Sequence, residues 1–365
     1  MQWHLDSMHA DEMWKVSTGK GVTVAVIDGG VGDIPELAGQ VLPGTNYARL
    51  SSGDERDDYN GHGTTMAAII AGTGKGPGGD GSYGLAPGAK ILPIRISQGG
   101  GGESQHEGFI KGIRYAADSE AKIMNISMSG VGDTAELQEA VRYALGKGKL
   151  IFAAVGNDGS HGVDYPAGTP GVVGVGSVDK SAEASKMSQY GAQVDISAPG
   201  DDIVSGCGGK TGVCKTSGTS DATALASASA ALIWSAHPDW TNNQVLRVLL
   251  NTSGKPRDGV ERNDYIGYGV VRPRIALAAP GDPGPANVYP LPDLAAAEAK
   301  GKATPSSAPS ASTDGKTPEK ATRVPEAAEA GGGLGAVTWI ALGLGACLVI
   351  GGAVTAVVVR RNRRP

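Results

Sequence analysis

Short apolar runs that alternate with helical segments constrain the fold of this chain more than any other feature. Between Gly21 and Leu277 the apolar runs are rich in Val, Ile and Ala, and they are interspersed with stretches of helical character. Continuous apolar strands separated by helices are typical of a mostly parallel sheet with helices on both faces. The sequence therefore predicts a three-layer α/β domain, with strands at residues 23–28, 90–96, 122–127, 150–155, 172–178 and 194–196 and helices at residues 64–71, 107–117, 135–146, 220–236 and 241–251.

Four polar residues stand at the ends of these predicted elements, each close to a glycine. Asp28 closes the first strand and precedes two glycines, and Asn157 follows a glycine at the end of the strand at 150–155. His62 lies between two glycines at the start of a helical run, and Ser220 begins a helix of small residues after a glycine-containing turn. Because ligand sites in parallel sheets lie at the carboxyl ends of the strands, we expect Asp28 and Asn157 to belong to one site.

These residue types suit nucleophilic catalysis by a serine. A serine hydroxyl attacks only when a neighbouring base takes its proton, a carboxylate orients that base, and donors receive the developing anion. Ser220 is the candidate nucleophile, His62 the base and Asp28 the orienting acid, while Asn157 and the Ser220 amide at a helix N-terminus are candidate oxyanion donors. Each residue alone has a commoner structural role as a turn former, loop residue or helix cap. Their combination favours catalysis.

The chain order Asp, His, Ser, with these local sequences, resembles that of the subtilisin-type serine peptidases. The resemblance spans roughly residues 21–277 and implies a subtilisin-like fold, an endopeptidase acting on peptide or protein substrates without a cofactor, and the four roles given above. It also implies that an extended peptide pairs with the chain as an added strand, while Met128 and residues 153–156 shape the pocket for the residue before the scissile bond. The implied substrate-binding residues are Gly99, Gly100, Gly101, Ser127, Met128, Ser129 and Gly130, although a run of glycines also fits a flexible surface loop.

Three positions depart from the family's usual pattern. The residue after the serine is usually Met or Phe and the fourth residue after it is Pro, whereas this chain has Asp221 and Ala224. Thr65 replaces a second histidine. We expect Asp221 to alter the local field, and hence the rate and pH optimum, or simply to complement the dipole of the helix that it begins.

The three cysteines divide into a pair and a single residue. Cys207 and Cys214 bracket a short glycine-rich loop, and we predict that they form a disulfide, which fits an oxidising compartment. Their spacing alone also allows a pair of free thiols. Cys347 lies in an apolar run and is expected to be inert.

Charge and metal-ligand patterns exclude some partners. The net charge of −5 argues against a nucleic-acid partner. The acidic run at residues 53–60 has three interpretations, namely a calcium site, attraction of basic substrates, or a solvated loop, and the solvated loop is favoured. Because its spacing does not match an EF-hand loop, we predict no metal among the site residues and leave a structural calcium ion open.

The composition divides the chain into five segments. Residues 1–20 form an N-terminal arm and residues 21–279 the peptidase domain, whereas the Pro, Ala and Ser-rich stretch at 280–333 predicts a disordered linker. The uncharged apolar run at 334–359 predicts a transmembrane helix. Arginines in the tail at 360–365 place that end in the cytoplasm and the catalytic domain outside the cell. This topology implies a signal peptide on the native precursor.

The order of these segments carries a second resemblance. The arm with its Gln2-Trp3-His4-Leu5 sequence, the peptidase domain, the Pro-rich linker and the apolar span together resemble the mycosins, peptidases associated with type VII secretion in actinobacteria. That resemblance implies partners among the membrane components of such a system. The alternative is a scaffolding component of a membrane secretion complex with little or no turnover. A further hypothesis is that the arm lies across the cleft and restrains activity.

Overall fold

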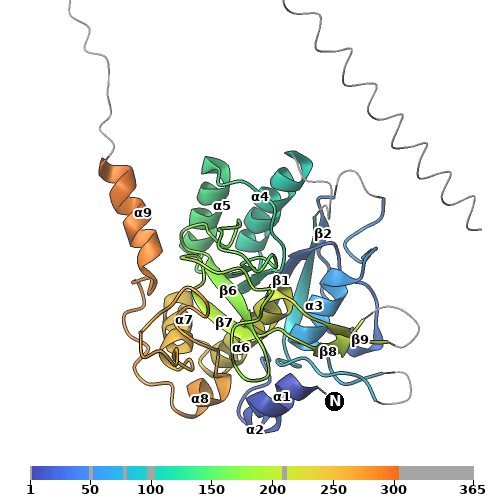
Figure 1. Cartoon of the computed structure of the whole chain (residues 1–365). Helices are drawn as coiled ribbons and strands as arrows, with labels where there is room; N and C mark the ends of the chain where they lie inside the picture. Colours follow the sequence, from blue (N-terminus) through green and yellow to red (C-terminus); the bar gives the residue numbers. More distant parts are fainter. Residues whose placement is uncertain (1, 49–51, 77–79, 97–102, 208–211, 304–365) are drawn as a thin grey trace, which may run out of the picture. The chain divides into compact units, whose positions relative to one another are not determined.

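A seven-stranded parallel sheet forms the centre of the protein (Figure 1). The computed structural model describes residues 2–48, 52–76, 80–96, 103–207 and 212–303. The strands follow the order β2-β3-β1-β4-β5-β6-β7, and each neighbouring pair is parallel. Their bounds are β1 Thr23–Asp28, β2 Thr45–Asn46, β3 Lys90–Arg95, β4 Ile123–Ile126, β5 Leu150–Ala154, β6 Val173–Val178 and β7 Ile196–Pro199.

Helices cover both faces of this sheet, which confirms the predicted three-layer α/β fold (Figure 1). Helices α4 and α5 cover one face, and α3 and α6 the other. A separate antiparallel hairpin consists of β8 Ile203–Gly206 and β9 Val213–Thr216. The helices are α1 Trp3–Met8, α2 Ala10–Trp14, α3 His62–Ala71, α4 Glu103–Asp118, α5 Ala135–Gly146, α6 Thr219–Ala236, α7 Asn242–Asn251, α8 Pro273–Ala278 and α9 Pro292–Ala303.

Strand β1 shows how the sequence builds two cores. Val24 and Val26 pack into the cluster that contains α3 and α6, whereas Ala25 and Ile27 pack into the cluster that contains α4 and α5. Successive side chains of a strand point to opposite faces, so an all-apolar strand serves both layers. By the same alternation the side chain of Asp28 points towards the face of α3 and α6.

Helix α6 lies in contact with five strands because its side chains are small. Most of its residues between Thr219 and Trp234 are Ala, Ser or Thr, and nearly all are buried. The helix packs against β4, β5, β6 and β7 and also contacts β1. Small side chains let a helix approach a sheet closely, so α6 holds its first turn, with Ser220, at the edge where the strands end.

The C-terminal part of the described chain corrects the predicted linker. Residues 280–291 follow the surface of α7 in a defined path, because Arg247 donates to the carbonyls of Pro283 at 2.7 Å and Val288 at 2.5 Å. Helix α9 then begins at Pro292. The prediction of disorder was therefore wrong for residues 280–303, because carbonyls between Pro283 and Val288 accept from side chains of α7 and the following residues form α9.

The remaining C-terminal predictions fall outside the described residues. These are the linker from residue 304 to 333, the apolar span at 334–359, the tail at 360–365, and Cys347. In the described part of the chain, no helix is long and apolar enough to cross a membrane.

The N-terminal arm folds into α1 and α2 and is tied to the domain by side-chain hydrogen bonds. The amide of Gln2 donates to the carbonyls of Tyr83 at 2.7 Å and Val204 at 3.0 Å. The indole N–H of Trp3 donates to the carbonyl of Asp202 at 3.0 Å, and the indole N–H of Trp14 donates to the carbonyl of Leu85 at 2.9 Å. The arm therefore belongs to the packed domain, as the burial of its apolar residues also indicates.

Candidate active site

Asp28 and His62 form a hydrogen-bonded pair at the carboxyl end of the sheet. Asp28 is the last residue of β1 and is fully buried. The Nδ1 atom of His62 lies 2.9 Å from each carboxylate oxygen of Asp28. The backbone N–H of Gly29 donates to Oδ1 of the same carboxylate at 2.8 Å. The carboxylate is thus fixed in place, and it orients the imidazole so that its other nitrogen is directed away from the strand.

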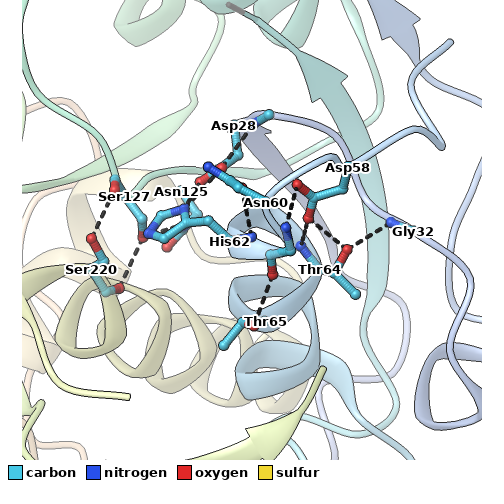
Figure 2. A network of polar contacts seen from close by, with 12 residues as sticks. Asp28, Gly32, Asp58, Asn60, His62, Thr64, Thr65, Asn125, Ser127 and Ser220 are labelled. Atoms are coloured by element: carbon cyan, nitrogen blue, oxygen red, sulfur yellow. Dashed lines mark hydrogen bonds and ion pairs between the residues drawn. The ribbon is translucent and has the colours of Figure 1, made fainter. Parts of the chain in front are cut away.

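The turn that precedes α3 fixes the backbone of His62 (Figure 2). One carboxylate oxygen of Asp58 accepts from the backbone N–H of Gly61 at 3.0 Å, and the other accepts from the N–H of Thr64 at 2.8 Å and its hydroxyl at 2.7 Å. Gly61 has a φ of 76°, a conformation that glycine adopts without strain. The side chain of Asn60 accepts from the N–H of His62 at 2.9 Å. Asp58 therefore acts as a cap for the helix that carries the imidazole.

Carboxylates around His62 favour its charged form. The negative charge of Asp28 is the main cause and outweighs the effect of burial, so that the pKa of His62 is raised to about 9. The charges of Asp221 and Asp58 act in the same direction. At neutral pH the imidazole is therefore mostly protonated, and the free-base form increases in alkaline solution.

Ser220 lies in the first turn of α6, beside the residue that follows β4 (Figure 2). Its hydroxyl donates to the backbone carbonyl of Ser127 at 2.9 Å, and the hydroxyl of Ser127 donates to the carbonyl of Ser220 at 2.9 Å. In this structure the Ser220 hydroxyl is therefore hydrogen-bonded to the carbonyl of Ser127 rather than to His62. For Ser220 to act as a nucleophile, its side chain must turn from this carbonyl to the imidazole of His62.

A buried polar network supports this pair and was not predicted from the sequence. The side-chain N–H of Asn125 donates to the hydroxyl of Ser127 at 3.0 Å, and the hydroxyl of Ser227 donates to the oxygen of Asn125 at 3.0 Å. All three side chains are buried. The sequence does contain a signal for this network. Asn125 lies two residues before Ser127, on the same face of the strand, and Ser227 lies two helical turns after Ser220, on the same face of the helix.

Asn157 is positioned by the first residue of α6. Its side-chain oxygen accepts from the backbone N–H of Thr219 at 2.8 Å and from the Thr219 hydroxyl at 3.1 Å. With that oxygen engaged, the NH₂ group of the exposed Asn157 side chain is available to a substrate. The first backbone N–H groups of a helix have no partner within the helix, so the N–H of Ser220 is a second donor. Two donors beside a nucleophile suit a developing oxyanion.

Asp221 is a buried carboxylate next to the candidate nucleophile. Its side chain is 2% exposed, and its Oδ1 accepts from the hydroxyl of Thr216 at 2.5 Å. Burial is the main cause that raises its pKa, to about 6, against the opposing effects of Thr216 and His62. At neutral pH the residue therefore carries a negative charge for most of the time.

The side chains of His62, Asn157, Ser220 and Asp221 border one cavity of about 700 Å³. The predicted disulfide is confirmed, because Cys207 and Cys214 are bonded with their Cα atoms 5.8 Å apart, and both line this cavity. Within the described ranges, no group of three or more His, Cys, Asp or Glu side chains is arranged to hold a metal ion. The cavity is lined by Asp58, Tyr59, Asn60, Gly61, His62, Thr65, Met66, Asn157, Cys207, Cys214, Thr216, Ser217, Gly218, Ser220 and Asp221.

The structure brings together some of the predicted site residues and separates others. Asp28, His62, Asn157 and Ser220 meet at one end of the sheet, and Ser127 joins them through its bonds to Ser220. The segment from Met128 to Gly130 continues the chain after β4 and does not line the cavity. The predicted residues Gly99, Gly100 and Gly101 lie outside the described residues.

The N-terminal arm does not belong to the described lining of this cavity. Its helices instead contact the β8–β9 hairpin and α8, and their apolar side chains belong to the cluster that contains α3 and α6. The hypothesis that the arm lies across the cleft was therefore wrong. The apolar side chains of α1 and α2 explain the difference, since they are buried against that cluster.

A serine peptidase with the chain order Asp, His, Ser is the class of protein that this sheet and the groups at its carboxyl end define. The profile of the subtilase family, Peptidase S8, matches residues 19–269, and the chain belongs to that family. It is 37% identical over 233 residues to the major intracellular serine protease of Bacillus subtilis, a match that covers 61% of this chain and 72% of that protein. Subtilisin Savinase of Lederbergia lenta is 33% identical, with 65% of this chain and 84% of that protein covered.

Solved structures of mycosin proteases share the fold, which confirms the predicted mycosin-type resemblance. MycP1 from Mycobacterium smegmatis is 28% identical, with a TM-score of 0.70 over 78% of this chain and 86% of that one. MycP3 protease, from the type VII (ESX-3) secretion system, is 31% identical, with a TM-score of 0.66 over 75% of this chain and 87% of that one. The chain is therefore a subtilisin-like serine protease with mycosin homologues.

Proposed function

We propose that this protein is a membrane-anchored extracellular serine endopeptidase associated with type VII secretion, in which Asp28, His62 and Ser220 form the catalytic triad. The observation that carries the proposal is the position of His62 Nδ1, 2.9 Å from both carboxylate oxygens of Asp28, at the end of the sheet that also holds Ser220. General-base activation of a serine hydroxyl requires an imidazole that a hydrogen-bonded carboxylate orients towards the serine. Asp28 and His62 supply these two groups.

The reaction begins when the Ser220 hydroxyl leaves the Ser127 carbonyl and gives its proton to the neutral imidazole of His62. The serine oxygen attacks the scissile carbonyl carbon, and the resulting oxyanion accepts hydrogen bonds from the Asn157 side chain and the Ser220 N–H. His62 then gives the proton to the leaving amine, and a water molecule activated by the same imidazole releases the acyl group. Removal of the asparagine donor in a subtilisin lowers turnover about 10²–10³-fold.

The location and the secretion partner rest on separate observations. The apolar run at 334–359 and the arginines after it support a membrane anchor with the catalytic domain outside. The Cys207–Cys214 disulfide is compatible with an oxidising compartment. The likeness to MycP1 and MycP3, the latter described as part of a type VII system, supports partners among the membrane components of such a system.

Labelling with a fluorophosphonate probe tests the catalytic part of the proposal. The full-length chain should be labelled, whereas Ser220→Ala and His62→Ala should not, because the probe reacts only with an activated serine. Ser127→Thr, which keeps a hydroxyl and the backbone carbonyl, is the matched control and should still be labelled. A folded wild-type protein that fails to label would contradict the proposal.

A scaffolding role with little turnover is the second candidate. It is favoured by the Ser220 hydroxyl, which is bonded to the Ser127 carbonyl, and by the acidic Asp221 in place of the usual apolar residue. Secretion in cells that carry Ser220→Ala distinguishes the two roles. Normal secretion with this variant, together with its loss on deletion of the whole protein, would favour scaffolding.

A further inference from the structure

The cavity beside Ser220 and His62 has an acidic lining. In the described part of the chain it contains two carboxylates, Asp58 and Asp221, and neither lysine nor arginine. The two carboxylates differ in their surroundings. Asp58 is engaged by the N–H groups and the hydroxyl that cap α3, whereas Asp221 receives the hydroxyl of Thr216 and its own backbone N–H and faces the charge of His62. Asp221 therefore has fewer hydrogen-bond donors than Asp58, and its nearby cationic group is the imidazole of His62.

Asp221 is buried, and its charge is only partly compensated by its neighbours. It is 2% exposed, and among the described residues no lysine or arginine forms an ion pair with it. A buried carboxylate is costly unless it is paired, and the Thr216 hydroxyl, the N–H of Asp221 and the charge of the protonated His62 offset part of that cost. The start of α6 provides some compensation through the helix dipole, but this effect is modest.

Gly218 leaves open the space that a partner would occupy. A Cβ atom at this position would lie 3.6 Å from Oδ2 of Asp221 and 3.4 Å from the side-chain nitrogen of Asn157. Any larger residue at 218 would therefore stand between the carboxylate and the oxyanion donor. Because the residue is glycine, a substrate bound at Asn157 and Ser220 has access to the carboxylate of Asp221.

The cavity lies on the side of the leaving group. His62 gives its proton to the leaving amine, so the part of the substrate after the scissile bond lies against this imidazole. The cavity is built around His62, from residues 58–61 before it and from Thr65 and Met66 one turn later. The segment from Met128 to Gly130, expected to pair with the acyl part of the substrate, does not contribute to the described lining.

We propose that Asp221 makes the enzyme selective for lysine or arginine as the residue immediately after the scissile bond. This inference rests on the proposed peptidase function and assigns the substrate class for one side of the same site. The carboxylate of Asp221 receives the ammonium or guanidinium group, and the aliphatic stem of the basic residue passes over Gly218.

Partitioning of the acyl-enzyme between water and added amines measures this selectivity directly. The full-length chain is acylated by an activated peptide ester, and lysinamide, argininamide or norleucinamide is added as the competing nucleophile. The amine nitrogen attacks the ester carbonyl of acyl-Ser220, the carbon–oxygen bond to serine breaks, an amide forms, and the amine's proton returns to the serine oxygen through His62. The ratio of amide to acid product reports binding of the leaving-group residue alone.

Norleucinamide matches lysinamide in chain length and lacks the charge. We expect lysinamide and argininamide to give about tenfold more aminolysis than norleucinamide at pH 8, where the carboxylate of Asp221, with a pKa of about 6, is ionised. Asp221→Asn should bring the ratio close to one, and so should Asp221→Met, which introduces a residue usual in the family. Asp239→Asn, which removes the same charge from an exposed position, should leave the preference intact.

Two results overturn the inference, and they are distinguishable from a failure of the peptidase function. Equal partitioning of lysinamide and norleucinamide in the wild-type enzyme would overturn it, as would a preference that persists in a folded Asp221→Asn or Asp221→Met variant. In both cases the ester is still hydrolysed by Ser220. Absence of hydrolysis that depends on Ser220 would instead reject the peptidase function, and the inference with it.

Discussion

Ser127 and Ser220 hold each other through two hydrogen bonds of 2.9 Å, in which each hydroxyl donates to the backbone carbonyl of the other residue. Ser127 follows β4 and Ser220 lies in the first turn of α6, so the pair joins the sheet to the helix that carries the candidate nucleophile. Ser127 also accepts from the buried side chain of Asn125. One residue therefore contributes both to stability and to the position of the nucleophile.

Replacement of Ser127 by alanine should lower both stability and reactivity. The variant leaves the buried side-chain N–H of Asn125 without its acceptor, which costs about 1–3 kcal/mol. It also frees the first turn of α6, so labelling of Ser220 by a fluorophosphonate should slow. Ser229→Ala is the matched control, because Ser229 is buried on the same helix and donates to the carbonyl of Leu225. It should lose stability in urea without slower labelling.

The pH dependence of labelling should follow the imidazole of His62. Only the neutral imidazole accepts the serine proton, and the pKa of His62 is raised to about 9, mainly by Asp28. The labelling rate should therefore rise with pH and level off above about 9. The same raised pKa stabilises the folded protein fully below pH 6.5, and this contribution is lost as the pH rises through about 9. Comparison of urea unfolding of wild type and His62→Gln across this range measures the loss.

Removal of the charge of Asp221 should shift the pH dependence of labelling. Its negative charge helps to raise the pKa of His62, so Asp221→Asn should move the midpoint of labelling to lower pH. At pH 7 the variant should then show a larger fraction of its own maximal rate than the wild type does. A midpoint that stays in place or moves upward would show that the charge of Asp221 does not act on the imidazole.

The cap formed by Asp58 can be separated from its charge. Asp58→Ala removes the acceptor for the N–H groups of Gly61 and Thr64 and should cost about 0.5–2 kcal/mol in the free energy of unfolding. Asp58→Asn keeps one of the two acceptor oxygens, the one that can serve Thr64, and should recover part of this loss. If both variants lose stability equally, the charge rather than the cap is responsible.

Elements whose ends are marked in the local sequence could be predicted well. Strand β1 was predicted with its observed bounds, Thr23–Asp28, because an apolar run stops there at an acid and two glycines. Helix α5 likewise covers the predicted residues 135–146, after a Thr134 cap that accepts from Leu137 at 3.2 Å. The four polar residues that meet at the site stand at such ends, which is why the sequence was sufficient to choose them.

Features that depend on contacts between distant residues could not be predicted. The two residues of β2 and the β8–β9 hairpin are too short to show a period in the sequence. The link from Asn125 to Ser227 depends on how α6 is placed along β4. Residues 280–291 have the composition of a linker, and their order comes from Arg247 and neighbouring side chains of α7, which donate to their carbonyls.

The segment that follows residue 279 should therefore contribute to the stability of the domain. Leu291 is 2% exposed, and the hydroxyl of Tyr289 donates to the carbonyl of Gly171 at 2.9 Å. Leu291→Ala removes a buried side chain and leaves a cavity, which should cost about 2–5 kcal/mol. Val288→Ala is the matched control, because the side chain of Val288 is 49% exposed, and it should change stability by less than about 0.5 kcal/mol.

Urea unfolding of the full-length chain, followed by tryptophan fluorescence, measures both variants. Arg247→Ala should also destabilise the protein, since its guanidinium holds the carbonyls of Pro283 and Val288. If residues 280–291 were instead a linker that the domain does not need, Leu291→Ala and Val288→Ala would unfold at the same urea concentration as the wild type. A loss of stability in Leu291→Ala and Arg247→Ala, but not in Val288→Ala, would show that the stable unit of the peptidase domain extends past residue 279. These two side chains contribute to the free energy of unfolding only if the segment is packed on the domain.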